Sequence, residues 1–397
     1  MNIKNIILLL VALVLPLATP QPIISEVFNV FLFIGLVVVY LAVMLSSTRI
    51  LKRENNSFMF IIFLGASWML MSLTINAVIT DYEFSVFWAV LKILIWLTTI
   101  PLLLGFAKQN WETFLPISLR ILQLVVVVIS LGLYLSLINS DVSRFFAGNY
   151  GLSYAEISAM LQYYNDRPSS FLGNPNFLGV FSAFCFIVLS MSEANKQKLN
   201  VLLLSFLICN ILLSRSRTAL IILMVFIILN LFYNITHLRK GSGLGFLFLF
   251  IMITFAFFTL NSTDIYISRY ISNINLAGRE QIWFKLIEEI SALEILLGSY
   301  GNYQDGITLD SDYLFVLYFS GFIGVFLLCL MYVRILMSVR FAREVVFFMI
   351  PMLTASLALS LISTTKMFLP TLILLTISFC LAFKRINCSR IESEVLQ

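Results

Sequence analysis

Residues 121–138 read ILQLVVVVISLGLYLSLI and contain no charged side chain. An apolar run of this length matches the roughly 17–25 helical residues that cross a bilayer. Comparable runs recur along the chain, whose residues are 60% hydrophobic and only 11% charged, whereas soluble domains carry about 25% charged residues. The sequence therefore predicts an all-α, polytopic integral membrane protein and excludes a soluble enzyme.

Twelve apolar segments are predicted to be transmembrane helices, and the first and seventh are the shortest. The segments are residues 5–19, 23–46, 57–79, 86–106, 117–138, 174–191, 200–214, 218–236, 244–260, 312–336, 345–363 and 367–383. The first could be a signal peptide, but Pro20 spoils its cleavage site, so we expect it to be retained.

The chain divides accordingly into three groups of helices and two long connections. The parts are N-terminal helices (1–138), a loop (139–173), central helices (174–260), a second loop with an interfacial helix (261–311), and C-terminal helices with a tail (312–397). Loops longer than about 12–15 residues usually carry function or are disordered. Aromatic residues such as Tyr154 and Trp283 in the two loops favour a functional site there.

The basic residues predict the orientation, because Lys and Arg concentrate in cytoplasmic loops. With the amino terminus in the cytoplasm, inner loops and tails hold 15 of the 25 basic residues and outer segments hold eight. Both termini are then cytoplasmic, and both long loops face the outside.

Several functional classes are excluded by composition. The net charge of +5 is small and its basic residues form short clusters between apolar runs, so we expect no nucleic-acid partner. Four of the five cysteines lie within apolar runs, which offers no disulfide framework. The single histidine, His237, cannot form a His-rich metal site.

Ser214-Arg215-Ser216-Arg217 is the one basic cluster in a short loop that falls on the outer side. Charges at a membrane boundary need a partner, and guanidinium groups bind phosphate oxygens in a bidentate way. The helix that starts here adds unpaired N–H groups. Arg215 and Arg217 are therefore predicted to bind an anion, although snorkelling to headgroups or pairing with Asp264 or Glu280 would also explain them.

The stretch GNPNFLG at residues 173–179 opens the sixth segment on the same side. Asn174 suits an N-cap and Pro175 suits the first helical position, so capping alone would explain both. Asn176 would then project from the first turn, where it could bond a sugar or a phosphate.

Arg279-Glu280-Gln281-Ile282-Trp283 lies in the second long loop. Arg279 is a candidate third phosphate ligand, and Trp283 could stack on a sugar ring. Amphipathic interfacial helices routinely carry both residue types, so the spacing alone leaves both interpretations open.

Asp310-Ser311-Asp312 precedes the tenth segment. Acidic residues at a helix start need no further function, because Asp caps helices well. They lie, however, on the same predicted side as Arg215, whereas His237 is predicted to be cytoplasmic. Asp310, and secondarily Asp312, are therefore the candidates for a catalytic base.

Four stretches occur in the order and spacing of one superfamily. They are Gly173–Gly179, Ser214–Ala219, Arg279–Trp283 followed by Leu297–Gly301, and Asp310–Gly324. On these stretches the chain resembles the O-antigen polymerase and O-antigen ligase superfamily of bacterial polysaccharide assembly. The resemblance covers roughly residues 170–330, and Asp310-x-x-Tyr313-Leu314-(x6)-Gly321-x-x-Gly324 is its most specific part.

The resemblance implies a C-type glycosyltransferase of the bacterial inner membrane, with a periplasmic active site and no metal or cofactor. Its donor and acceptor would be undecaprenyl-diphosphate-linked oligosaccharides, with membrane lipids and a chain-length regulator protein as partners. Arg215, Arg217 and Arg279 would hold the diphosphate. Ligases carry a histidine where this chain has Asp310, which favours a Wzy-type polymerase over an O-antigen ligase acting on lipid A-core.

A lipid-linked oligosaccharide flippase is the alternative from another class, since such transporters also commonly have twelve spans. A transporter should place polar residues near the bilayer midplane, on interrupted helices. In this sequence Lys92 is the clearest buried charge, and the polar residues gather at one predicted face. The sequence therefore favours chemistry at the membrane surface.

Overall fold

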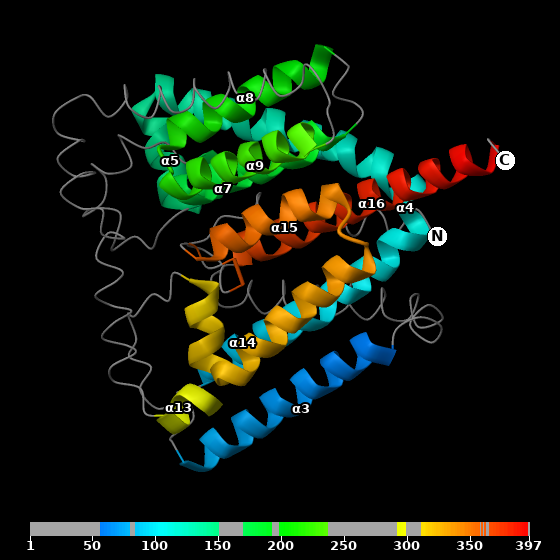
Figure 1. The fold of residues 1–397 in the computed structure, drawn as a ribbon. Coiled ribbons are helices and arrows are strands. Elements are labelled where there is room, and N and C mark those ends of the chain that lie inside the picture. The colour runs from blue at the N-terminus through cyan, green and yellow to red at the C-terminus, as the bar shows by residue number, and fades with distance from the viewer. Residues whose placement is uncertain are drawn as a thin grey trace.

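The computed structural model describes residues 56–79, 84–150, 170–192, 198–236, 292–298, 311–357, 359, 361–362 and 365–395. Within these ranges the regular secondary structure is helical and contains no strand, which confirms the all-α prediction for them (Figure 1). The elements are α3 (Asn56–Ile79), α4 (Phe84–Ile138), α5 (Ser140–Tyr150), η1 (Ser170–Leu172), α7 (Pro175–Met191), α8 (Lys198–Ser214), α9 (Arg217–Thr236), α13 (Ala292–Leu297), α14 (Asp312–Ser338), α15 (Arg343–Ser356) and α16 (Thr365–Val395).

The described helices have the composition of a membrane-embedded protein. Four of them contain stretches long and apolar enough to cross a membrane: Ala89–Ile138, Arg217–Asn234, Asp312–Ser338 and Met367–Ser389. Large apolar side chains also cover the outer surface of the described helices. Examples are Phe63 of α3 and Phe232 of α9, which are 71% and 68% exposed. Water would disfavour such a surface, whereas lipid accommodates it.

Several predicted segments coincide with observed helices. The segments 57–79, 174–191, 200–214, 218–236 and 312–336 match α3, α7, α8, α9 and α14 to within two residues at each end. The predicted segments 5–19, 23–46 and 244–260 lie outside the described residues.

Helix α4 corrects one predicted boundary, because it runs without interruption through residues 107–116, where the sequence predicts a loop. Straight, its 55 residues would extend about 80 Å, more than twice the hydrocarbon thickness. The rings of Phe106 and Phe114 nevertheless lie 5.3 Å apart, whereas eight residues of straight helix span about 12 Å. Figure 1 shows that α4 is bent and that its two arms diverge, and the helix contains Pro101 and Pro116, a residue type that kinks helices.

Two other boundaries also differ from the sequence prediction. The predicted loop 139–173 begins with helix α5, which only Asn139 separates from α4, and its Asn139 Oδ1 accepts the Asp141 N–H at 2.8 Å. Helix α15 ends at Ser356 instead of residue 363. Its continuation turns toward α14, where Asp312 Oδ1 accepts the Ile362 N–H at 2.7 Å.

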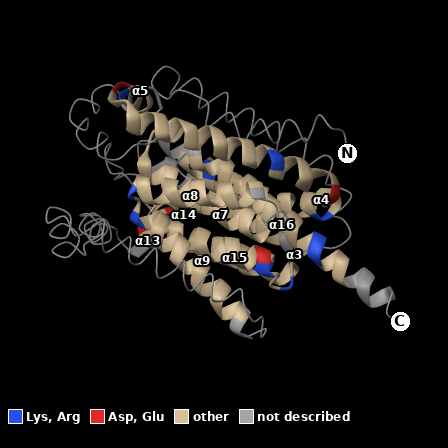
Figure 2. Ribbon diagram, turned by 90° about the horizontal axis from the view of Figure 1, so that it is seen from above, with Lys and Arg blue, Asp and Glu red and all other residues tan. Residues whose placement is uncertain are grey.

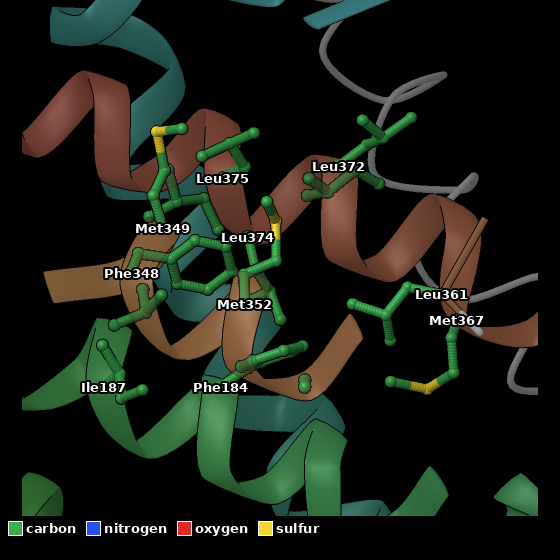
Figure 3. Packing of buried hydrophobic residues seen from close by; sticks show 14 of the residues in the cluster. Phe184, Ile187, Phe348, Met349, Met352, Leu361, Met367, Leu372, Leu374 and Leu375 are labelled. Atoms are coloured by element: carbon green, nitrogen blue, oxygen red, sulfur yellow. The ribbon is translucent and has the colours of Figure 1, made fainter. Parts of the chain in front are cut away.

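Helix α7 lies at the centre of the helical core. Most of its residues are buried, as expected for a helix that is apolar on all sides. Figure 3 shows Phe184 and Ile187 of α7 packed with Phe348 and Met352 of α15, beside Leu374 of α16. Phe184 and Phe348 meet with ring centroids 5.2 Å apart. This packing fixes α7 relative to α15 and α16.

An ionic cluster ties helices α9, α15 and α16 together at one end. Glu344, at the start of α15, is 4% exposed. Its carboxylate accepts a hydrogen bond from Arg385 Nη1 at 3.0 Å, and Arg385 Nη2 donates to the Tyr233 hydroxyl at 2.9 Å. The Arg343 guanidinium lies over the Tyr233 ring, 5.1 Å from its centroid. We call these four residues the Glu344 cluster.

Replacement of Glu344 by Ala is expected to lower the free energy of unfolding by about 2 kcal/mol. Removing one partner of a buried ion pair costs about 3–5 kcal/mol, but the Arg385 side chain is 44% exposed and can turn toward water. Unfolding in mixed micelles titrated with SDS measures the loss. Asp141→Ala is the matched control, because the Asp141 side chain is 82% exposed and its pair with Arg144, at 3.6 Å, contributes about 0.5 kcal/mol. Equal losses would show that the Glu344 pair adds nothing beyond a surface pair.

Candidate functional site

The two arginines of the basic cluster flank a tight turn between α8 and α9. Helix α8 ends at Ser214, and α9 begins at Arg217. Arg215 adopts a positive φ of 50° and its N–H donates to the Leu212 carbonyl at 3.1 Å. Both arginine side chains are exposed, whereas Ser214 and Ser216 are fully buried. The alternation turns the guanidinium groups away from the core.

The two serines hold this turn in shape. Ser214 Oγ donates to the Ile211 carbonyl at 2.8 Å and accepts the Ser216 N–H at 3.3 Å. Ser216 Oγ in turn accepts the Ala219 N–H at 3.4 Å, as an N-cap residue does. Side-chain bonds of this kind satisfy backbone groups that the helix ends leave open. Residues 214–217, Ser-Arg-Ser-Arg, therefore present their charges on a locally braced turn, which we call the arginine turn.

Gly179 of α7 allows the turn to pack directly against that helix. A Cβ atom on Gly179 would lie 2.5 Å from Ser214 Oγ, 2.7 Å from Ser216 Cβ and 2.9 Å from Ala219 Cβ. Real Cβ atoms do not approach so closely, so only glycine fits here. Two stretches that the sequence analysis considered separately, 173–179 and 214–219, thus form one contact.

The start of α7 has the cap that the sequence predicts. Asn174 adopts an extended conformation, its Oδ1 accepts the Asn176 N–H at 2.8 Å, and Pro175 occupies the first helical position. Asn176 lies half-buried in the first turn, three residues before Gly179. Because residues three apart share a helix face, Asn176 lies on the side of α7 that faces the arginine turn.

Helix α14 begins with three consecutive residues that each bind another part of the chain. Ser311 Oγ donates to the Ser356 carbonyl at 3.1 Å, and the Tyr313 hydroxyl donates to the Leu353 carbonyl at 3.2 Å. Asp312 is 2% exposed and accepts the Ile362 N–H. These bonds fasten the start of α14 to the end of α15 and give Asp312 a structural role.

The starts of α9 and α14 lie at the same end of the bundle. Tyr233, near the end of α9, contacts Arg343 at the start of α15, so these two helices run in opposite directions. The far end of α15 contacts Tyr313 at the start of α14. The arginine turn and Asp312 are therefore both at the end opposite the Glu344 cluster. Figure 2 shows charged positions mainly toward the ends of the helices.

A second close contact, in which two glycines take part, joins α13 to α14. Gly298, directly after α13, has φ 99°, and Gly321 breaks α14 with φ 65° and ψ −173°. A Cβ on Gly298 would lie 3.1 Å from the Tyr318 carbonyl oxygen, and one on Gly321 would overlap the Leu296 carbonyl. The two backbones thus cross in contact. Figure 1 shows α14 bending at this crossing, near α13.

The remaining candidates lie outside the described residues. These are Asp310, Arg279 and Trp283. Their predicted roles as acceptor base, third phosphate ligand and sugar-stacking residue stay predictions. Among the described residues, no group of three or more His, Cys, Asp or Glu side chains could hold a metal ion.

Two residues of α3, Trp68 and Ser72, contribute contacts that sequence reasoning missed. The Trp68 indole N–H donates to the Ser320 carbonyl at 2.9 Å, and Ser72 Oγ donates to the Leu297 carbonyl. In the sequence both stand in an apolar run, where nothing distinguishes them from other membrane-embedded residues. Only their tertiary partners reveal their role.

No protein-family model, curated protein or solved structure matches this chain. The resemblance to the O-antigen polymerase and ligase superfamily therefore stays a prediction, and it depends on the four sequence stretches.

Proposed function

We propose that this protein is a glycosyltransferase that polymerises undecaprenyl-diphosphate-linked oligosaccharide repeat units at the periplasmic face of the bacterial inner membrane. The observation that supports the proposal most directly is the arginine turn. Its two exposed guanidinium groups stand at the start of α9, and Gly179 seats the turn against α7. The turn and the start of α14, where the base is predicted, lie at one end of the bundle.

The charge changes of the reaction suit this arrangement. Breaking the anomeric C–O bond develops oxocarbenium character on the sugar and negative charge on the departing diphosphate. Arg215 and Arg217 would stabilise that negative charge, as preorganised cationic donors do in other phosphate sites. The acceptor hydroxyl attacks the anomeric carbon and loses its proton to a base, for which we propose Asp310. Asn176, one turn before Gly179, would bond the diphosphate or the first sugar.

A flippase is the second candidate, and one observation favours it. Helix α14 is interrupted at Gly321 within its apolar sequence, and interrupted helices are common at transporter binding sites. However, the Ser320 carbonyl at the break already accepts the Trp68 N–H. The arginine turn and Asp312 lie at helix starts instead. This distribution of polar groups supports catalysis near the membrane surface over transport through the middle of the bundle.

The decisive experiment is chain growth in detergent, where no membrane separates two sides. The purified protein is incubated with lipid-linked repeat units isolated from cells that lack this chain. We expect polymer and released undecaprenyl diphosphate to appear together. A flippase would produce neither, since it makes and breaks no glycosidic bond, and that result would overturn the proposal.

Arg215→Lys is expected to lower the rate of chain growth about 10²-fold, because it keeps the charge but loses the planar fork that binds two phosphate oxygens. Arg340→Lys is the matched control. Arg340 is also exposed and has the same kind of backbone, with φ 51° against 50° for Arg215, but it follows α14 at the opposite end. Equal rates for the two variants would reduce Arg215 to a headgroup anchor.

A further inference from the structure

At the crossing of α13 and α14, two backbone carbonyl groups accept hydrogen bonds from side chains of a third helix. Ser320 directly precedes Gly321, where α14 breaks, and Leu297 directly precedes Gly298, where α13 has ended. In an unbroken helix each carbonyl would accept the N–H four residues later. An unsatisfied carbonyl is costly in an apolar surrounding. A hydrogen-bond donor from another helix therefore stabilises the Ser320 and Leu297 carbonyls.

Helix α3 supplies both donors from one face. Trp68 donates to the Ser320 carbonyl and Ser72 donates to the Leu297 carbonyl. The two residues are four apart, so they lie one above the other on the helix. The same face carries Gly65, where a Cβ would make ordinary contacts with Leu97 of α4 at 3.6 Å and Leu327 of α14 at 4.0 Å. This face of α3 thus packs against α4 and α14 and donates both hydrogen bonds to the crossing.

The part of α14 before the break, residues 312–320, is consequently held at both ends. At its start, Ser311, Asp312 and Tyr313 bind the end of α15 and the segment that follows it. At its other end, the glycine crossing and the two donors of α3 fix its direction. We call this part the first arm of α14. A change at either end is therefore expected to redirect the first arm.

We propose that Trp68 and Ser72 are positioning residues that fix the first arm of α14, and with it the acceptor side of the active site. The proposal rests on the proposed function for its catalytic consequence only. Helix α3 lies outside the part of the chain that resembles the polymerase and ligase superfamily. The two donors bond Ser320 and Leu297, whereas the arginine turn packs against Gly179 of α7. They therefore act on chain growth and not on diphosphate binding.

Hydrogen exchange tests the structural half of the proposal without any activity. Trp68→Phe and Ser72→Ala each remove one donor, and the exchange of the first-arm amides should become about tenfold faster in each, which corresponds to the loss of one hydrogen bond. Ser72→Thr retains the hydroxyl and should leave exchange unchanged. Thr74→Ala is the matched control, since the Thr74 hydroxyl bonds only the Leu70 carbonyl of its own helix. Equal exchange in Ser72→Ala and Thr74→Ala would overturn the proposal.

Two functional measurements test the other half. In Trp68→Phe and Ser72→Ala the rate of chain growth should fall about tenfold, while the Kd for undecaprenyl diphosphate alone stays that of the wild type. Ser72→Thr should restore the rate. If the Kd rises as much as the rate falls, the two residues support the whole protein and the positioning role is wrong. If the wild-type protein forms no polymer, the proposed function fails, and the exchange measurements alone decide whether α3 fixes the first arm.

Discussion

Gly179→Ala is expected to abolish nearly all chain growth while the protein still inserts into the membrane. The added methyl group would meet Ser216 Cβ at 2.7 Å and Ala219 Cβ at 2.9 Å. These atoms sit directly on the backbone, so the α8–α9 turn must move as a unit. A displacement of about 1 Å can cost roughly 10²-fold in rate, and Arg215 and Arg217 would move together. We expect a loss of at least that size.

Gly105→Ala is the matched control for this substitution. Gly105 also lies inside an apolar helix, α4, but a Cβ built on it meets no atom within 4 Å. Alanine favours a helix over glycine by about 1 kcal/mol, so the control should be as active as the wild type or slightly more stable. Binding of undecaprenyl diphosphate and chain growth are measured for both variants. Wild-type binding and activity in Gly179→Ala would show that the seat of the arginine turn against α7 is unimportant.

The contact at Gly179 also shows what the sequence could predict about the site. Local chemistry correctly predicted the cap of α7, because Asn174 and Pro175 act on the backbone next to them. The position of the arginine turn was predictable as well, since it separates two apolar runs. That Gly179 meets the turn was not predictable, because the contact joins residues more than thirty positions apart and depends on how α7, α8 and α9 pack.

The same distinction explains the errors in the fold. Residues 107–116 contain Lys108 and Glu112, and polar residues between apolar runs usually indicate a loop. The segment is helical because its residues have adequate helix propensity and its polar side chains bond within the helix, as Asn110 does to the Phe106 carbonyl. Helix α15 ends early for a different reason, a tertiary hydrogen bond that the Ile362 N–H donates to Asp312 Oδ1. In both cases the length of the apolar run did not predict where the helix ends.

Gly321→Ala is expected to have the largest effect on stability, with little folded protein recovered. At φ 65° and ψ −173° the backbone lies in a region that is essentially restricted to glycine, so an alanine there costs about 1–3 kcal/mol for its conformation alone. Its Cβ would also overlap the Leu296 carbonyl oxygen and lie 2.8 Å from the Gly298 nitrogen. Both atoms belong to the backbone of the crossing segment, so no side-chain rotation relieves the overlap. The backbone strain and the overlap together are expected to lower the free energy of unfolding by at least about 3 kcal/mol. Protein yield and unfolding in mixed micelles measure this loss.

Gly65→Ala is the control, because it changes a helical glycine of the neighbouring α3 whose Cβ would make only ordinary contacts with Leu97 and Leu327. It should be neutral or slightly stabilising. If Gly321→Ala were as stable as Gly65→Ala, α14 would tolerate a straight conformation at this position. The Ser320 carbonyl would then accept the N–H four residues later, as in a straight helix, and the Trp68 N–H would lose its acceptor. The break in α14 would in that case be a consequence of packing, and α3 could not control the first arm through it.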